Sequence, residues 1–314
     1  MVLGGQRGGQ AAGATTALAG VLMVLTWGSS SVATKVGMGG YDPGQLTLFR
    51  FLVTSAVMIL FAVVTRMRLP ARRDVLPLVG LGLLGISITQ FTFTYGMVDV
   101  DPGTATFLVS TVPVLTAVIA RFVLGERLTA AGWTGIGLTV IGTTVLVLGK
   151  GQGVDYTRGA LILLFGAFTE AWYYILQKPF LRRYSGVEVS TWALIAATFP
   201  MLVFLPGLGG QIADATAEET GAIIYVALGA GVIGYACMAI VNSRLPASVA
   251  AVLMAGLPPV ALVTAWIWIG DMPAMVSILG GLMSLVGMLL VTLRGAAVPV
   301  TGPDPAVATA LAGD

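Results

Sequence analysis

The sequence predicts an all-α integral membrane protein whose ten transmembrane helices form two inverted repeats of five helices. Three observations support this prediction. Of the 314 residues, 57% are apolar and only 10% are charged, and the mean hydropathy is +0.94, whereas soluble proteins carry about 25% charged residues. Ten apolar segments each approach the roughly 20 residues that cross a bilayer. The sequence also matches itself when it is shifted by 145 residues.

Short loops separate the ten apolar segments and leave no room for a soluble domain. The segments cover 15–36, 46–65, 75–97, 103–124, 129–148, 159–180, 189–207, 221–243, 247–269 and 274–293. The first segment is too long for the apolar region of a signal peptide, and the repeat requires it. We therefore expect a cytoplasmic N-terminal segment (1–14), a first repeat (15–148), a periplasmic linker (149–158), a second repeat (159–294) and a disordered cytoplasmic tail (295–314).

The distribution of basic residues predicts the orientation. With the N-terminus in the cytoplasm, only four of the 16 Lys and Arg residues fall on the outer side, namely Lys35, Arg50, Lys150 and Arg158. Loops that stay in the cytoplasm carry an excess of Lys and Arg. The protein is therefore expected in the inner membrane, with both termini in the cytoplasm.

Pairs of residues 145 positions apart define the internal repeat. Trp27 pairs with Trp172 and Pro113 with Pro258, and further pairs are Gly135–Gly280, Gly142–Gly287 and Glu126–Asp271. Because each half holds an odd number of helices, the second half enters the membrane from the opposite side. Inverted repeats are typical of secondary transporters, whose substrate site lies near the midplane between the halves, although some channels also use them.

The fifth and tenth segments carry small residues at helical spacing. Gly135, Thr139 and Gly142 share one helix face, as do Gly280, Ser284 and Gly287. Small residues at this spacing let helix backbones approach closely in lipid. These two segments are expected to form a packed scaffold and not to line a site.

Polar and aromatic residues cluster inside the first, third, sixth and eighth segments. A lone Ser or Thr in a membrane helix can simply bond to its own backbone, but a cluster beside aromatics indicates the wall of a watery cavity. The candidate substrate-binding residues are Trp27, Ser30, Arg50, Gln90, Tyr95, Glu170, Trp172, Tyr173 and Tyr235. The substrate is expected between the aromatic residues, with Glu170 and Arg50 supplying charge.

Glu170 lies near the middle of the sixth segment. A carboxylate at that depth is costly and by default faces a cavity or an ion pathway. It is expected to carry a proton or to bind a substrate amine. The alternative is a structural role, as the ion-pair partner of Arg50 or Lys35.

Pro113 and Pro258 lie inside the fourth and ninth segments. A proline in a helix removes one backbone hydrogen bond and kinks the helix. Each proline is either a static bend or a gating hinge beside the cavity.

Composition excludes several classes of function. The chain has no His and one Cys, Cys237, so a Cys/His metal site, an internal disulfide and a Ser-His-Asp triad are all excluded. Gly149-Lys150-Gly151 lacks the spacing and the Ser or Thr of a phosphate loop. The net charge of +2 does not suggest nucleic-acid binding. We expect no cofactor, no metal and no enzymatic activity.

Two stretches carry a family resemblance. From Trp27 the sequence reads WGSSSVATK, and from Pro113 it reads PVLTAVIARFVLGERLTAAGWTGIGLTVIG. This pattern resembles the EamA-type branch of the drug/metabolite transporter superfamily, over nearly the whole chain. The resemblance implies ten helices, a central cavity formed by helices one to four and six to nine, and export of small metabolites, often amino acids. Ser30 and Asp271 depart from the family pattern, which often has Asn and Glu there, and Glu170 matches no general motif.

The sequence thus predicts a secondary transporter that exports a small metabolite, an amino acid or a drug-like compound, by alternating access, with proton coupling through Glu170 as an option. Its partners are a small-molecule substrate and the lipid bilayer, and it acts as a monomer or a homodimer. The alternative is a membrane channel or sensor without alternating access.

Overall fold

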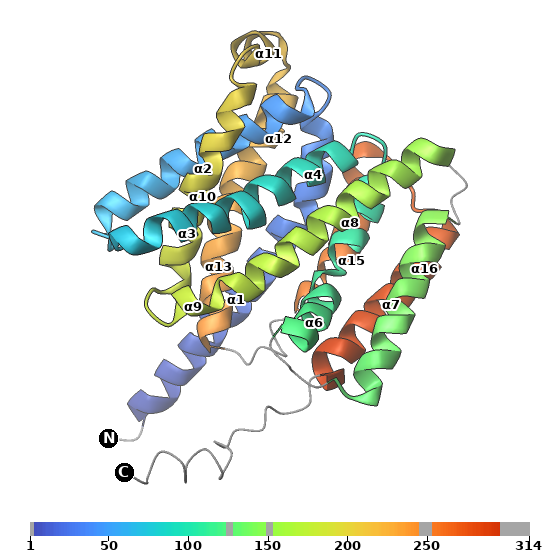
Figure 1. Cartoon of the computed structure of the whole chain (residues 1–314), viewed down its shortest axis with the longest axis horizontal. Helices are drawn as coiled ribbons and strands as arrows, with labels where there is room; N and C mark the ends of the chain where they lie inside the picture. The colour runs from blue at the N-terminus through green and yellow to red at the C-terminus, as the bar shows by residue number, and fades with distance from the viewer. Residues whose placement is uncertain (1–2, 124–127, 149–152, 245–252, 296–314) are drawn as a thin grey trace.

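The computed structural model describes residues 3–123, 128–148, 153–244 and 253–295 (Figure 1). Within these ranges the chain is helical, with no strand. Seven helical runs are long and apolar enough to cross a membrane, namely Thr15–Gly37, Pro43–Val64, Arg72–Gly96, Pro102–Val123, Tyr156–Leu181, Gly186–Phe204 and Ala217–Met238. Three shorter apolar helices are Ala130–Leu146, Leu257–Ile269 and Met275–Leu290. The described parts of the ten predicted segments are therefore mainly helical, with turns inside the fourth and ninth.

The first half contains seven α-helices and one π-helical stretch. In order they are α1 (Leu3–Gly37), α2 (Pro43–Val64), α3 (Arg72–Gly82), the π-helical η1 (Leu83–Ile88), α4 (Thr89–Gly96), α5 (Pro102–Val109), α6 (Val112–Val123) and α7 (Ala130–Leu148). Helix α1 starts within the N-terminal segment predicted at 1–14, so most of that segment continues the first membrane helix. Glu126 lies outside the described residues.

The second half has additional short elements. In order they are α8 (Gly153–Leu176), α9 (Lys178–Leu181), α10 (Gly186–Met201), the 3-10 turn η2 (Leu202–Phe204), α11 (Leu208–Asp214), α12 (Ala217–Tyr225), the π-helical η3 (Val226–Gly234), α13 (Tyr235–Arg244), α15 (Leu257–Ile269), α16 (Met275–Leu290) and the π-helical η4 (Val291–Gly295). Helix α8 begins inside the predicted linker 149–158. Its first turns are polar, so the helix starts several residues before the apolar segment predicted at 159. Residues 149–152, most of the predicted tail and the start of the ninth segment lie outside the described residues.

The surface and the interior have the polarity expected in a bilayer. Large apolar side chains face outward, such as Phe122 at 76% and Ile267 at 75% exposure, while Thr34 and Ser87 are fully buried. Lipid offers apolar side chains a favourable surface, whereas buried hydroxyls bond to helix backbones. Ser87, for example, donates a hydrogen bond to the carbonyl of Ala197 at 2.8 Å. This is a multi-pass membrane protein.

The two halves are interleaved. Helix α1 packs against η3, α13 and α15 of the second half, and α8 packs against η1, α4 and α6 of the first. The first membrane helix of each half therefore lies between the third and fourth membrane segments of the other. Neither half builds a core of its own.

The third and eighth membrane segments each contain a π-helical stretch that the sequence did not suggest. A shift of 145 residues places η1 (Leu83–Ile88) on 228–233, inside η3. Both stretches contain glycines that lie against side chains of the other half. A Cβ on Gly85 would overlap the ring of Tyr173, and one on Gly234 would overlap the indole of Trp27. Such π-helical insertions in membrane helices often occur at functional sites.

The fourth and ninth membrane segments are broken directly before their prolines. Helix α5 ends at Val109 and α6 begins at Val112, and the chain turns at 255–256 before α15 begins at Leu257. Pro113 and Pro258 are each the second residue of the helix that follows, where a missing N–H costs no intrahelical hydrogen bond. The predicted kinks are thus interruptions of the helix at matching positions of the two halves.

Helices α7 and α16 lie side by side at one edge of the molecule (Figure 1). A Cβ on Gly142 would lie 2.7 Å from the Gly280 carbonyl oxygen, and one on Gly135 would lie 2.6 Å from the Gly287 carbonyl oxygen. Between them the Thr139 hydroxyl donates to the Ser284 carbonyl at 3.4 Å. These contacts are reciprocal. Gly142 meets Gly280, which is the repeat partner of Gly135, and Gly135 meets Gly287, which is the repeat partner of Gly142. They are the contacts that a local two-fold axis produces.

The two ends of the helix bundle differ in their connections. We call them the α9 end, which includes residues 65–71 and 177–185, and the α11 end, which includes residues 38–42, 97–101 and 205–216 (Figure 1). At the α9 end the buried carboxylate of Asp74 pairs with Arg183 at 2.9 Å and accepts a hydrogen bond from the Tyr184 hydroxyl at 2.8 Å. This ion pair joins α3 to the segment between α9 and α10.

Replacing Gly142 by Ala should destabilise the protein by about 1–3 kcal/mol, because the new methyl group meets backbone that cannot move away. Thermal unfolding in detergent measures the effect. Gly137→Ala is the matched control on the same helix, since no atom lies within 4 Å of its added Cβ. The control should be neutral or slightly stabilising. Equal unfolding temperatures for the two variants would contradict the close packing of α7 on α16.

Candidate substrate cavity

A cavity of about 540 Å³ lies between the two halves. Its wall draws on nearly every membrane segment, including α1, α2, α4, α8, α13 and both halves of the broken fourth segment. Its lining reaches Lys178, which is exposed at the α9 end. In the other direction it ends near Ser31, Phe93 and Thr106.

The α11 end is closed above the cavity. The side chains of Thr34 and Met97 are fully buried there, and Val100 is 1% exposed. The Lys35 ammonium donates hydrogen bonds to the carbonyls of Met97, at 2.6 Å, and Val98, at 3.1 Å. These carbonyls end α4, where a positive charge is favourable. Among the described residues, the lining of the cavity therefore reaches the α9 end and stops short of the α11 end.

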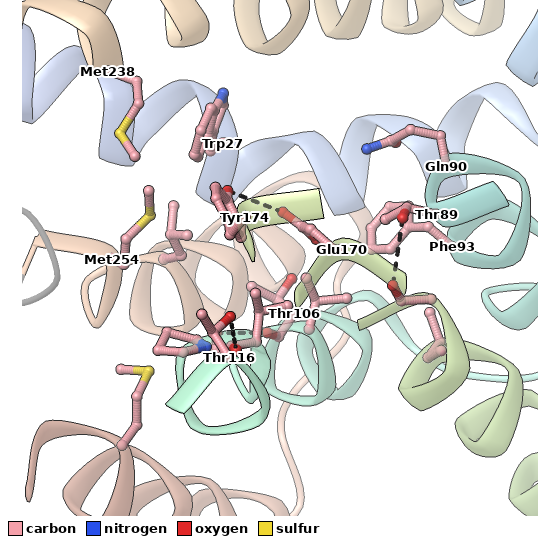
Figure 2. A pocket seen from close by; sticks show the side chains of 18 of the residues that line it. Trp27, Thr89, Gln90, Phe93, Thr106, Thr116, Glu170, Tyr174, Met238 and Met254 are labelled. Carbon is pink, nitrogen blue, oxygen red and sulfur yellow. Dashed lines mark hydrogen bonds between the residues drawn. The ribbon is translucent and has the colours of Figure 1, made fainter. Parts of the chain in front are cut away.

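Two oppositely charged groups from different halves, Arg50 and Glu170, line this cavity. Arg50, on α2, is 8% exposed, and its Nη1 atom donates a hydrogen bond to Oε1 of Gln90 at 2.7 Å. Glu170, on α8, accepts a hydrogen bond from the Tyr174 hydroxyl at 3.3 Å (Figure 2). In the described part of the chain no hydrogen bond or ion pair joins Arg50 to Glu170. Neither of the ion pairs considered for Glu170, with Arg50 or with Lys35, is therefore present.

Trp27 forms part of the wall and is held by η3. Its indole N–H donates to the Ala230 carbonyl at 3.0 Å, and its ring meets Tyr235 edge-on with the centroids 5.3 Å apart. The absence of a side chain at Gly234 makes room for the indole. A tryptophan fixed in this way presents a rigid aromatic surface to the cavity.

Hydroxyl groups on α1 and near the break between α5 and α6 also line the cavity. The Thr106 hydroxyl donates to Ser31 at 2.9 Å and that of Ser110 to the Thr106 carbonyl at 2.8 Å. Thr89 and Thr169 share a hydrogen bond at 2.9 Å, and Figure 2 shows Thr89, Thr106 and Thr116 around the cavity. Each hydroxyl keeps a free lone pair or donor direction for water or a ligand.

Seven of the eleven residues expected at the site line the cavity, and four do not. The seven are Trp27, Ser30, Arg50, Gln90, Glu170, Tyr235 and Pro113. The other four, Tyr95, Trp172, Tyr173 and Pro258, are not among the residues that line it. Tyr95 stacks on Phe91 with ring centroids 4.2 Å apart, and Tyr173 is 6% exposed in the core beside Gly85.

Trp27 and Trp172, both expected beside the substrate, differ in position, since Trp27 lines the cavity and Trp172 does not. Trp172 packs edge-on against Phe168, with centroids 6.4 Å apart, in a cluster with α6. Gly234, which admits the Trp27 indole, corresponds to Thr89 in the first half, so the two tryptophans do not have equivalent surroundings.

Helical phase explains why Trp172 is excluded and why Tyr174 lines the cavity. Tyr174 and Lys178 follow Glu170 by four and eight residues and line the cavity, whereas Trp172 follows it by two. Positions four apart lie on one helix face, and a position two apart lies nearly opposite. Applying this spacing to Glu170 identifies Tyr174. Spacing alone does not exclude Tyr173, three residues after Glu170, which packs in the core beside Gly85. The lining methionines Met238, Met254 and Met288 had no comparable signal, because apolar residues are abundant throughout the sequence.

A cysteine placed on the wall should report water in the cavity. We expect Ser110→Cys, in a variant lacking Cys237, to react quickly with a small water-soluble thiol reagent, because Ser110 lines the cavity. Ser87→Cys is the matched control, because Ser87 is fully buried away from it. Labelling rates measured by mass spectrometry distinguish the two. Equally slow labelling of both sites would show that the cavity is closed to water.

Comparison with known proteins agrees with this architecture. The chain matches the EamA-like transporter family twice, over residues 14–148 and 157–293. It is 34% identical to the "Uncharacterized transporter YdfC" of Bacillus subtilis, over 87% of this chain and 89% of that protein. It is also 34% identical to the "Probable terminal-alkyne amino-acid exporter" of Streptantibioticus cattleyicolor, over 87% of this chain and 92% of that protein.

More distant similarities extend over most of the chain. The "Probable amino-acid metabolite efflux pump" of Escherichia coli is 25% identical over 86% of this chain and 92% of its own length. A solved structure named only "Crystal structure of protein" has a TM-score of 0.62 at 20% identity and covers 89% of this chain and 97% of its own, which shows a shared fold. With its two family matches and its similarity to transporters over nearly its full length, the chain belongs to the EamA-like transporter family of the drug/metabolite transporter superfamily.

Proposed function

We propose that this transporter exports a small zwitterionic metabolite of the amino-acid class by alternating access, with Glu170 coupling export to protons. The observation that carries the proposal is the pair of ionisable groups, Arg50 and Glu170, that line one cavity without pairing with each other. A substrate with a carboxylate and an ammonium group complements both.

The surroundings of each group favour a ligand of opposite charge. Gln90 is neutral, so its hydrogen bond orients the Arg50 guanidinium without neutralising it. A guanidinium presents several N–H donors in a plane and binds a carboxylate through two of them. Among the described residues Glu170 accepts a hydrogen bond from the Tyr174 hydroxyl alone, which leaves most of its acceptor sites for an ammonium group or a proton. A buried charge without a partner is costly, so a bound zwitterion would stabilise both groups.

Several features support an inverted repeat and alternating access. The family matches each half separately, the contacts of α7 with α16 are reciprocal, and the breaks before Pro113 and Pro258 occur at matching positions. Broken helices beside a central cavity are typical of transporters with inverted repeats. We propose ten transmembrane helices in two such repeats, 15–148 and 159–294. The breaks before the two prolines would be the hinges that change access.

The proposed orientation makes the cavity face the cytoplasm. The α9 end carries the basic residues Arg66, Arg68, Arg72, Arg73, Arg182 and Arg183, and such residues stay in the cytoplasm. Both chain termini would lie on that side. A cavity that loads from the cytoplasm and is closed by Lys35 at the other end suits an exporter. The names of two relatives, an amino-acid exporter and an amino-acid metabolite efflux pump, support the same substrate class.

The alternative is a channel or sensor without alternating access. Counterflow in proteoliposomes separates the two, because only a carrier accumulates labelled substrate against unlabelled substrate inside the vesicle. We expect saturable counterflow of a neutral amino acid. Passive, non-saturating flux would contradict the carrier mechanism.

Glu170→Gln should slow export and flatten its pH dependence, because the amide keeps the shape of the side chain but cannot exchange a proton. Losing a charge-assisted hydrogen bond of about 1.5–3 kcal/mol should also raise KM about tenfold or more. Transport rates across a pH series measure both effects. Glu188→Gln is the matched control, because Glu188 lies outside the cavity in the N-terminal cap of α10, where Gln also fits. An unchanged pH profile in Glu170→Gln would exclude coupling through this residue.

A further inference from the structure

The cavity has two chemically different poles. Arg50, Gln90 and Thr89 line one side, and the thioethers of Met238, Met254 and Met288 line another. Figure 2 shows Met238 and Met254 on the side away from Gln90 and Thr89, with Trp27, Tyr174 and Glu170 between them. We call the three methionines the methionine pole.

The methionine pole is assembled from three separate parts of the second half. Met238 lies on α13, Met254 directly before the break at 255–256, and Met288 on α16. Met238 and Met254 pack in one cluster with Trp27, and both remain partly exposed. Met288 is 2% exposed and lines the same cavity from a different hydrophobic cluster. Because the three methionines come from separate elements and line one cavity, their proximity depends on the tertiary fold and not on spacing along one helix.

The chemistry of methionine suits a variable apolar ligand. Its unbranched side chain has three rotatable bonds and a polarisable sulfur, and it adapts to ligands of different shape. The neighbouring lining residues Val291, Leu257 and Ile175 are also apolar. A charged or strongly polar group at this pole would lose its water without gaining a partner.

The dimensions leave room for a long side chain. Glu170 and Lys178 line the cavity eight residues apart, which is about 12 Å along a helix. The carboxylate and ammonium of an amino acid occupy only the region between Arg50 and Glu170. The cavity of about 540 Å³ is far larger than these two groups, since one water takes about 30 Å³.

We propose that the methionine pole is the side-chain subsite of this transporter and selects amino acids with a large apolar side chain over small or charged ones. The inference rests on the proposed function, since it assumes that Arg50 holds the carboxylate of the substrate and Glu170 holds its ammonium group. The methionine pole would recognise the side chain, which those two residues do not contact.

The first test is a counterflow series in proteoliposomes with the wild-type protein. The probes are glycine, alanine, norvaline, norleucine, phenylalanine and glutamate. Each buried methylene contributes roughly fourfold in affinity, so norleucine should exceed alanine by at least about tenfold. Phenylalanine should exchange about as well as norleucine, because its side chain is also large and apolar, and glutamate should not exchange. Equal exchange of alanine and norleucine would overturn the subsite and leave the proposed function standing, whereas no exchange of any probe would overturn both.

The second test changes the polarity of the pole at constant size. Met238→Gln and Met254→Gln should each lower the norleucine-to-alanine ratio by about fourfold or more, because an amide replaces an apolar thioether in the subsite. Met67→Gln is the matched control, because Met67 lies outside the cavity in the segment after α2, and it should keep the wild-type ratio. Retained norleucine preference in both pole variants would overturn the subsite. Thermal unfolding of each variant in detergent reports folding, and the wild-type series decides the proposal if a variant does not fold.

Discussion

The constraint on which this structure depends is that every backbone polar group inside a bilayer needs a partner within the protein. The described chain meets it with helices almost throughout, and it departs from regular α-helix around the cavity. There the protein supplies other partners. In η3 the Ala230 carbonyl accepts a hydrogen bond from the Trp27 indole, and both residues line the cavity. There, irregular backbone and the cavity wall occur together, because a broken helix can be satisfied at a polar, protein-lined site.

Glycine decides where the helices approach closely, and it does so in two different ways. In α7 and α16 the glycines let two backbones touch, which builds a rigid edge. In the π-helical stretches, Gly85 and Gly234 instead admit aromatic side chains of the other half. The first arrangement supports the bundle, and the second shapes the cavity. The same residue type thus separates the scaffold from the part of the molecule that carries the proposed substrate site.

Charge at the membrane interior is used sparingly. At the α11 end the Lys35 ammonium donates a hydrogen bond to the Met97 carbonyl that ends α4, and at the α9 end Asp74 forms an ion pair with Arg183. Of these five groups, Arg50 and Glu170 line the cavity, and their side-chain partners are the neutral Gln90 and Tyr174. Because burying a charge without an opposite charge is costly, this arrangement makes sense in a protein whose missing partner is a substrate that arrives and leaves.

Composition, segment length and the 145-residue shift by themselves predicted the membrane class, the apolar helical segments, the matching prolines and Arg50 and Glu170 as site candidates, because each depends on residue type and spacing alone. Helical phase, read from Glu170, also suffices to identify Tyr174. Only the tertiary structure decided that Trp27 faces the cavity and Trp172 does not, since Trp27 packs where Gly234 has no side chain and Trp172 packs against Phe168. The methionine pole likewise needed the fold. Apolar residues look alike in a membrane sequence, and only packing distinguishes a methionine that faces lipid from one that faces the cavity.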